Sequence, residues 1–70
     1  MDRIAIRSTN IKEVGYDAQS GTLEIMFSDL AVYQYFGVPE SIHDGLVSAT
    51  SAGQYFHRMI REKYRFTKVS

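Results

Sequence analysis

The chain has 70 residues, a formal net charge of zero, 44% hydrophobic residues and no cysteine. A chain of this length forms one domain with a thin core, and the absence of cysteine excludes disulfides, thiolate chemistry and cysteine-based zinc sites. No apolar run approaches the roughly 20 residues of a membrane-spanning helix, and the N-terminal residues lack the apolar stretch of a signal peptide. We therefore expect a single domain over residues 1–70 that resides in the cytoplasm and does not bind membranes.

Strands are predicted first. Residues 1–10 alternate weakly between apolar and polar side chains, which allows a short edge strand. Residues 11–17 predict the first strand of the main sheet, with Val14 and Tyr16 on one face. Gly15 lies between them and suggests a β-bulge or a close approach of another backbone segment.

Residues 22–28 have the strictest alternation in the chain and predict the next strand. Leu23, Ile25 and Phe27 share the face that we expect to be buried, and the residues between them point to the other face. A turn that ends at Gly21, which can adopt a positive φ, precedes this strand.

The loop after this strand decides how the third strand is oriented. With a two-residue loop, residues 29–30, Gln34 joins the buried face; with a three-residue loop, residues 28–30, Tyr33 and Tyr35 join it instead. We favour the longer loop because burial of an unpaired amide costs free energy. Its weak point is a leucine where the loop requires a left-handed residue.

Two helices are predicted after the third strand. Pro39 suits a first helical position, and the first helix over 39–49 has an apolar side formed by Ile42, Leu46 and Val47. Gly45 weakens this helix by roughly 1 kcal/mol relative to alanine.

Ser51 and Gln54 match a capping box at the start of a second helix, which extends to about residue 63. Its apolar stripe consists of Tyr55, Phe56, Met59 and Ile60, continued by Lys63 or Tyr64. Residues 65–70 alternate weakly and predict a short strand or a frayed tail.

These elements predict an α+β fold, a three-stranded antiparallel β-meander followed by two short helices that pack on one sheet face. The pattern also allows an extra N- or C-terminal edge strand. The other sheet face, with Glu24, Met26 and Gln34, is expected to be open to water or to a partner.

The charges are unevenly distributed along the chain. Residues 1–45 carry three basic and seven acidic side chains, whereas residues 46–70 carry five basic side chains and one acidic side chain. The five cations are Arg58, Arg61, Lys63, Arg65 and Lys68. They suit an anionic partner, but they also suit a solvated helix end, and charge alone favours the second interpretation.

Several short motifs follow one another along the chain: Gly15-Tyr16-Asp17, Leu23 to Phe27, Val32-Tyr33-Gln34-Tyr35, Val38-Pro39, Ala49 to Phe56 and Ile60-Arg61. In this order and spacing they resemble the KTSC domain, whose central signature Tyr-x-Tyr is matched by Tyr33 and Tyr35. The KTSC domain is a small bacterial and phage domain that is found alone and fused to the C-terminus of some lysyl-tRNA synthetases. The resemblance covers residues 8–66, with Leu30 in place of a turn glycine and His57 in place of asparagine.

The family has no established activity, and the synthetase fusion implies, by association, contact with RNA. We expect a non-catalytic binding module. The candidate nucleic-acid-binding residues are Tyr33, Tyr35, Arg58, Arg61, Lys63, Arg65 and Lys68. The two tyrosines are either a stacking platform for bases or core residues, and the longer hairpin loop favours the core. The alternative function is protein interaction or self-association through the open sheet face or an edge strand.

His43 and His57 are the side chains best suited to acid–base chemistry near neutral pH, but no third ligand stands at metal-binding spacing. Adjacent residues on a helix point to different faces, so we expect no dyad between His43 and Asp44. Ser51 is explained as a helix cap. The sequence therefore predicts no catalytic residue, no metal site and no cofactor.

Overall fold

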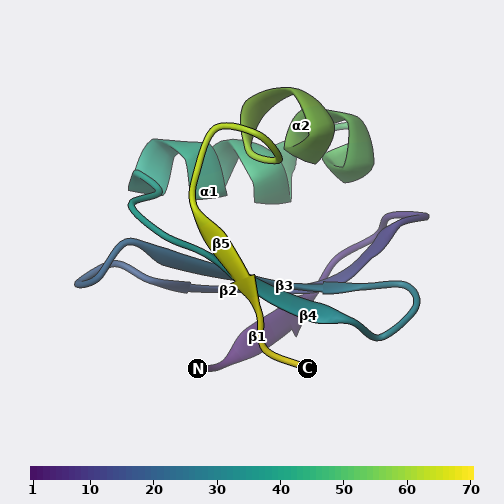
Figure 1. The fold of residues 1–70 in the computed structure, drawn as a ribbon. Helices are drawn as coiled ribbons and strands as arrows, with labels where there is room; N and C mark the ends of the chain where they lie inside the picture. Colours follow the sequence, from purple (N-terminus) through teal and green to yellow (C-terminus); the bar gives the residue numbers. More distant parts are fainter.

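The computed structural model describes residues 1–70 and contains one five-stranded antiparallel sheet with two helices on one face (Figure 1). The strands lie in chain order: β1 (Arg3–Ala5), β2 (Ile11–Asp17), β3 (Thr22–Phe27), β4 (Val32–Tyr35) and β5 (Phe66–Lys68). Helices α1 (Glu40–Ser48) and α2 (Ala52–Met59) separate β4 from β5 in the chain. The predicted α+β class is confirmed, and edge strands form at both ends of the chain. Neither helix is long and apolar enough to cross a membrane.

The β3–β4 hairpin has the three-residue loop that the sequence favoured. Leu23 pairs with Tyr35 and Ile25 with Tyr33, and the amide of Phe27 donates to the carbonyl of Ala31 at 2.9 Å. Both tyrosines therefore share the face of Leu23 and Ile25. Leu30 adopts a φ of +73°, the left-handed conformation that the loop requires and that a leucine adopts only at a cost.

The core lies between this sheet face and the helices. It consists of nine buried residues: Ile11, Val14, Leu23, Ile25, Tyr35, Val38, Leu46, Ala52 and Ile60. Ile42 and Val47 of α1, and Tyr55, Phe56 and Met59 of α2, pack against it, as do Tyr33 and Tyr64. The predicted apolar stripes of both helices are thus confirmed.

The boundaries of the helices differ slightly from the prediction. Pro39 is the N-cap of α1 rather than its first helical residue, with an extended ψ of 152°. Ser51 caps α2 as predicted, since its hydroxyl accepts from the amide of Gln54 at 3.3 Å. The helix ends at Met59, short of residue 63, because Ile60 leaves the helical conformation and the chain turns toward β5.

Two glycines permit close packing of the backbone. A Cβ at Gly15 would lie 2.6 Å from the carbonyl oxygen of Asp2, which confirms the close approach; the irregularity in β2 lies instead between Ile11 and Glu13. A Cβ at Gly45 would overlap with the hydroxyl group of Tyr55. Gly45 therefore lets α1 and α2 approach each other, a role that its helix propensity does not reveal.

The expectation of an open outer sheet face is wrong at Glu24, which is only 7% exposed. Arg3 of β1 donates from Nη1 to Glu24 Oε2 at 2.6 Å and from Nε to Glu13 Oε1 at 2.9 Å. Gln34 Nε2 donates to Glu24 Oε1 at 2.8 Å. Burial raises the pKa of Glu24, but the hydrogen bonds from Gln34 and Arg3 outweigh burial and lower this pKa below its ordinary value.

Candidate nucleic-acid interface

Five aromatic side chains come together on the helix-bearing side of the sheet, between β4, β5 and α2. They are Phe27, Tyr33, Tyr35, Phe56 and Phe66, and with Arg61 and Glu62 they line an open groove of about 460 Å³. We call it the aromatic groove. The antiparallel register of β4 and β5 produces it, because Tyr35 pairs with Phe66 and cross-strand partners share a face.

The rings are held in defined relative orientations. Phe56 meets Phe27 edge-on at a centroid distance of 5.2 Å and Tyr35 at 5.5 Å. Phe66 lies tilted against Tyr33 at 5.9 Å and against Tyr35 at 5.6 Å. Such edge and offset contacts stabilise a cluster beyond the burial of its surface, so the groove is preformed.

The two signature tyrosines have different environments. Tyr35 is 4% exposed and belongs to the core, as the longer loop predicted, whereas Tyr33 is only partly buried. Phe66 is 56% exposed and forms an open side of the groove. Burial, with a smaller contribution from Tyr33, raises the pKa of Tyr35 to about 12, so its hydroxyl stays protonated near neutral pH.

Four of the five predicted cations border this region. Arg61 lines the aromatic groove itself, and Lys68 pairs with Tyr33 across the β4–β5 ladder. Lys63 and Arg65 line a shallow depression that shares Phe66 with the groove. Arg58 does not belong to this group, because it lines a different cleft.

Sequence reasoning did not include Phe27, Phe56 and Phe66 among the site residues. Phe27 and Phe56 were assigned to buried stripes, and Phe66 lies in a segment whose alternation is weak. The weak alternation of residues 65–70 was the one indication in the sequence that Phe66 belongs to a strand. When this strand, β5, pairs with β4, Phe66 comes to lie beside the two tyrosines.

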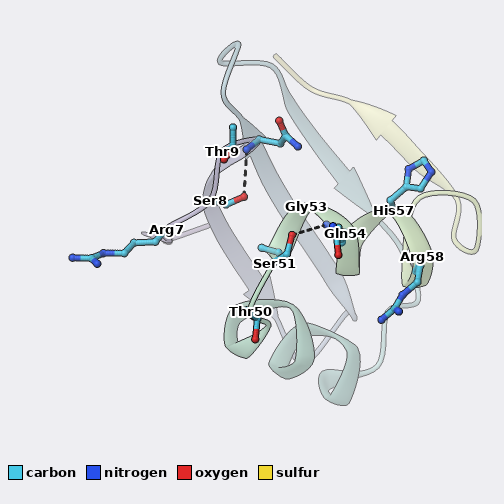
Figure 2. Close-up of a pocket in the computed structure, with 11 residues that line it drawn as sticks. Arg7, Ser8, Thr9, Thr50, Ser51, Gly53, Gln54, His57 and Arg58 are labelled. Carbon is cyan, nitrogen blue, oxygen red and sulfur yellow. Dashed lines mark hydrogen bonds between the residues drawn. The ribbon is translucent and has the colours of Figure 1, made fainter.

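A second, wider cleft of about 790 Å³ lies between the β1–β2 loop and the start of α2 (Figure 2). We call it the polar cleft. Apart from Ala52 its lining is not hydrophobic: Arg7, Ser8, Thr9, Asn10, Thr50, Ser51, Gly53, Gln54, His57 and Arg58. Ser8 Oγ accepts from the amides of Asn10 and Ile11, each at 3.3 Å, so the loop is ordered by its own side chain. One wall of the cleft therefore comes from residues 7–10 and the other from residues 50–58, and no carboxylate is among the lining residues.

The expectation that His43 and Asp44 point apart is wrong. His43 Nδ1 lies 3.2 Å from Asp44 Oδ1, because the histidine ring is turned to stack on Tyr16 at a centroid distance of 4.7 Å. Burial, followed by the charges of Glu40 and Asp44, raises the pKa of Tyr16, whose hydroxyl donates to the carbonyl of Val38. His43 lines neither the aromatic groove nor the polar cleft.

Comparison with protein families matches the KTSC domain over residues 7–64. The chain belongs to the KTSC domain family. This KTSC domain is similar to the crystal structure of a KTSC domain protein from Yersinia pestis, with a TM-score of 0.95 and 38% identity, covering 99% of this chain and 97% of that one. The resemblance inferred from the motifs is thus confirmed.

Two kinds of relatives share this domain. An uncharacterized protein of Stutzerimonas stutzeri is 33% identical over 70 residues, which cover 99% of both chains. A lysine–tRNA ligase of Trichormus variabilis is 40% identical over 60 residues, which cover 86% of this chain but 11% of the ligase. A lysine–tRNA ligase of Nostoc punctiforme matches to the same extent. The similarity to the ligases therefore concerns a small part of those proteins.

Proposed function

We propose that this KTSC domain binds single-stranded RNA by stacking unpaired bases in the aromatic groove. The observation that carries the proposal is the half-open cluster of five rings with Arg61 in its wall. Sequence-tolerant recognition of single-stranded nucleic acid combines aromatic surfaces for the bases with cations for the backbone.

Phe66 and Tyr33 are the rings that a base would meet. Phe66 is 56% exposed on an edge strand, and Tyr33 is partly buried beside it at 5.9 Å. Stacking of a base on one such ring contributes about 1–3 kcal/mol. Arg61 adds a guanidinium that can stack on a base or contact a phosphate.

The cations around Phe66 would contact the backbone. Lys68 lies opposite Tyr33 in the β4–β5 ladder, and Lys63 and Arg65 border the depression next to Phe66. None of these three forms an ion pair within the domain. Their charges are therefore available to phosphates, and binding would weaken as salt rises.

The relation to lysine–tRNA ligases supports RNA as the ligand. In two cyanobacterial ligases a region comparable to this chain accompanies an enzyme whose name specifies a tRNA. That region is a small part of each ligase. The ligases indicate the class of nucleic acid, and the aromatic groove indicates how it would be bound.

The test is fluorescence anisotropy with a labelled, unstructured RNA of about ten nucleotides at 50 and 200 mM salt. Phe66→Ser should weaken binding about 5- to 150-fold, the equivalent of one lost stacking contact. Ile4→Ser is the matched control, because Ile4 is 60% exposed on the opposite edge strand and lines no part of the groove. The melting temperatures of both variants should be close to that of the parent protein. No binding to RNA at low salt with 100 μM protein would refute the proposal.

The alternative is association through an edge strand, favoured by the exposed apolar residues Ile4 of β1 and Phe66 of β5. Open edges with apolar side chains promote pairing with another chain. Sedimentation equilibrium tests it: a dimer that Phe66→Ser dissociates would support this function, and a monomer at high concentration would exclude self-association.

A further inference from the structure

We infer that the polar cleft holds the sugar–phosphate backbone of the same RNA strand whose bases stack in the aromatic groove. The inference rests on the proposed function and extends the binding site to a surface with Arg7 and Arg58 among its lining residues. Single-strand-binding domains of comparable size engage roughly 4–16 nucleotides, so a path beyond the aromatic groove is expected of such a module.

A third depression shares lining residues with both the aromatic groove and the polar cleft. A depression of about 380 Å³ is lined by Asn10, which also lines the polar cleft, and by Phe27 and Tyr33, which also line the aromatic groove. Lys68 lines this depression as well. Its carboxylate, Asp29, already accepts a hydrogen bond from the amide of Ala31 at 3.0 Å. A strand can therefore pass from the rings to the polar cleft along Asn10 and Lys68.

The chemistry of the polar cleft suits a backbone rather than a base. Its side chains are hydroxyls and amides with two arginines and a histidine, and it contains neither a carboxylate nor an aromatic ring for stacking other than that of His57. Phosphate oxygens need donors, and a ribose hydroxyl needs both donors and acceptors, which serine, threonine and the amides supply.

The two arginines of the polar cleft are not used within the domain. The ion pairs of the structure join Arg3 to Glu13, Arg3 to Glu24 and His43 to Asp44, so neither Arg7 nor Arg58 has a carboxylate partner. Figure 2 shows that the two come from opposite walls, Arg7 from the β1–β2 loop and Arg58 from α2, and that the Arg7 side chain extends away from the other labelled residues. Both residues are exposed. They can move onto a phosphate without breaking an internal contact.

A direct contact also joins the two sites. His57 Nδ1, in the polar cleft, lies 3.2 Å from Nη1 of Arg61, in the aromatic groove. His57 lies in the last turn of α2 and Arg61 follows the end of the helix, so the contact joins the helix to the turn that leads to β5. The aromatic groove and the polar cleft are therefore also adjacent at the C-terminal end of α2.

The test compares RNA oligomers of two and eight nucleotides by anisotropy and by salt titration. The octamer should bind at least tenfold more tightly than the dinucleotide. The double variant Arg7→Gln with Arg58→Gln should weaken octamer binding about tenfold or more, reduce its log–log salt slope by about 1.4, and leave dinucleotide binding unchanged, because each phosphate contact to a single strand contributes about 0.7 to that slope. Lys12→Gln is the control, since Lys12 is an exposed cation of the same region that lines no depression.

The outcomes separate this inference from the proposed function. If Phe66→Ser weakens both oligomers while the double arginine variant matches the parent on the octamer, bases stack in the aromatic groove but the strand does not enter the polar cleft. That result would overturn the inference and leave the proposed function intact. If neither oligomer binds the parent protein, the proposed function fails and the inference fails with it.

Discussion

Substitution of the two signature tyrosines by alanine should lower the stability of the domain by different amounts, because Tyr35 belongs to the core and Tyr33 to the aromatic groove. They stand two residues apart on β4, share a face and have the same side chain, but Tyr35 is 4% exposed and Tyr33 is only partly buried. Tyr35→Ala removes a ring that contacts Phe56 and Phe66 and should cost about 3–5 kcal/mol, as for other buried aromatic residues. Tyr33→Ala loses less buried area and should cost about 1–2 kcal/mol.

The measurement is urea unfolding at pH 7 followed by far-UV circular dichroism. A domain of this size has about 3.5–10 kcal/mol of stability in total, so Tyr35→Ala should leave it barely folded, whereas Tyr33→Ala should remain folded at 25 °C. Tyr35→Phe is the control for the hydroxyl and should be within about 0.5 kcal/mol of the parent. Equal losses for the two alanine variants would refute the assignment of Tyr35 to the core and Tyr33 to the groove.

Three further substitutions test the fold. Leu30→Gly should stabilise the domain by roughly 0.5–1 kcal/mol in urea unfolding because it relieves the φ of +73°, whereas Leu30→Ala should not. Gly45→Ala should destabilise despite the helix propensity of alanine, and in a Tyr55→Ala background the same change should become stabilising. Because the pKa of Glu24 is lowered in the folded state, its contribution is present above pH 4.5 and is lost as the pH falls through the folded pKa; the stability difference between the parent and Glu24→Gln should shrink from pH 7 to pH 3.

The local part of the fold could be predicted from the sequence. Strict alternation over residues 22–28 and the cost of burying Gln34 were sufficient to choose the hairpin register, because a shift of one residue reverses every side chain. The helix stripes at Leu46 and Phe56 followed from their spacing in the same way. These features depend on residues within about ten positions of each other in the chain. Over such distances the spacing of apolar residues and the conformation of the turn determine the structure.

The remaining features depend on contacts between distant residues. The pairing of Arg3 with Glu24 spans 21 residues and requires β1 to lie on β2 in one particular register. Nothing in the alternation of residues 1–10 indicates that Arg3 covers the buried carboxylate of Glu24 on the sheet face opposite the helices. The polar cleft likewise needs the β1–β2 loop and the α1–α2 junction to meet, and the contact of Phe66 with the tyrosines needs β5 to return to β4.

The position of β5 explains where the basic residues at the C-terminal end of the chain lie in the fold. Two helices separate β4 from β5 in the chain, so the strand that completes the sheet arrives at its edge, directly after the cationic segment of residues 58–65. This return places Lys68 opposite Tyr33 and Arg61 beside Tyr35, whereas Glu13 and Glu24 lie on the other sheet face with Arg3. A cation near these rings therefore has no carboxylate from the sheet to neutralise it. The arrangement that makes Phe66 an exposed edge residue also gathers four cations around it, Arg61, Lys63, Arg65 and Lys68, against the single carboxylate of Glu62. An exposed ring with an excess of positive charge is the combination that suits a single strand of RNA.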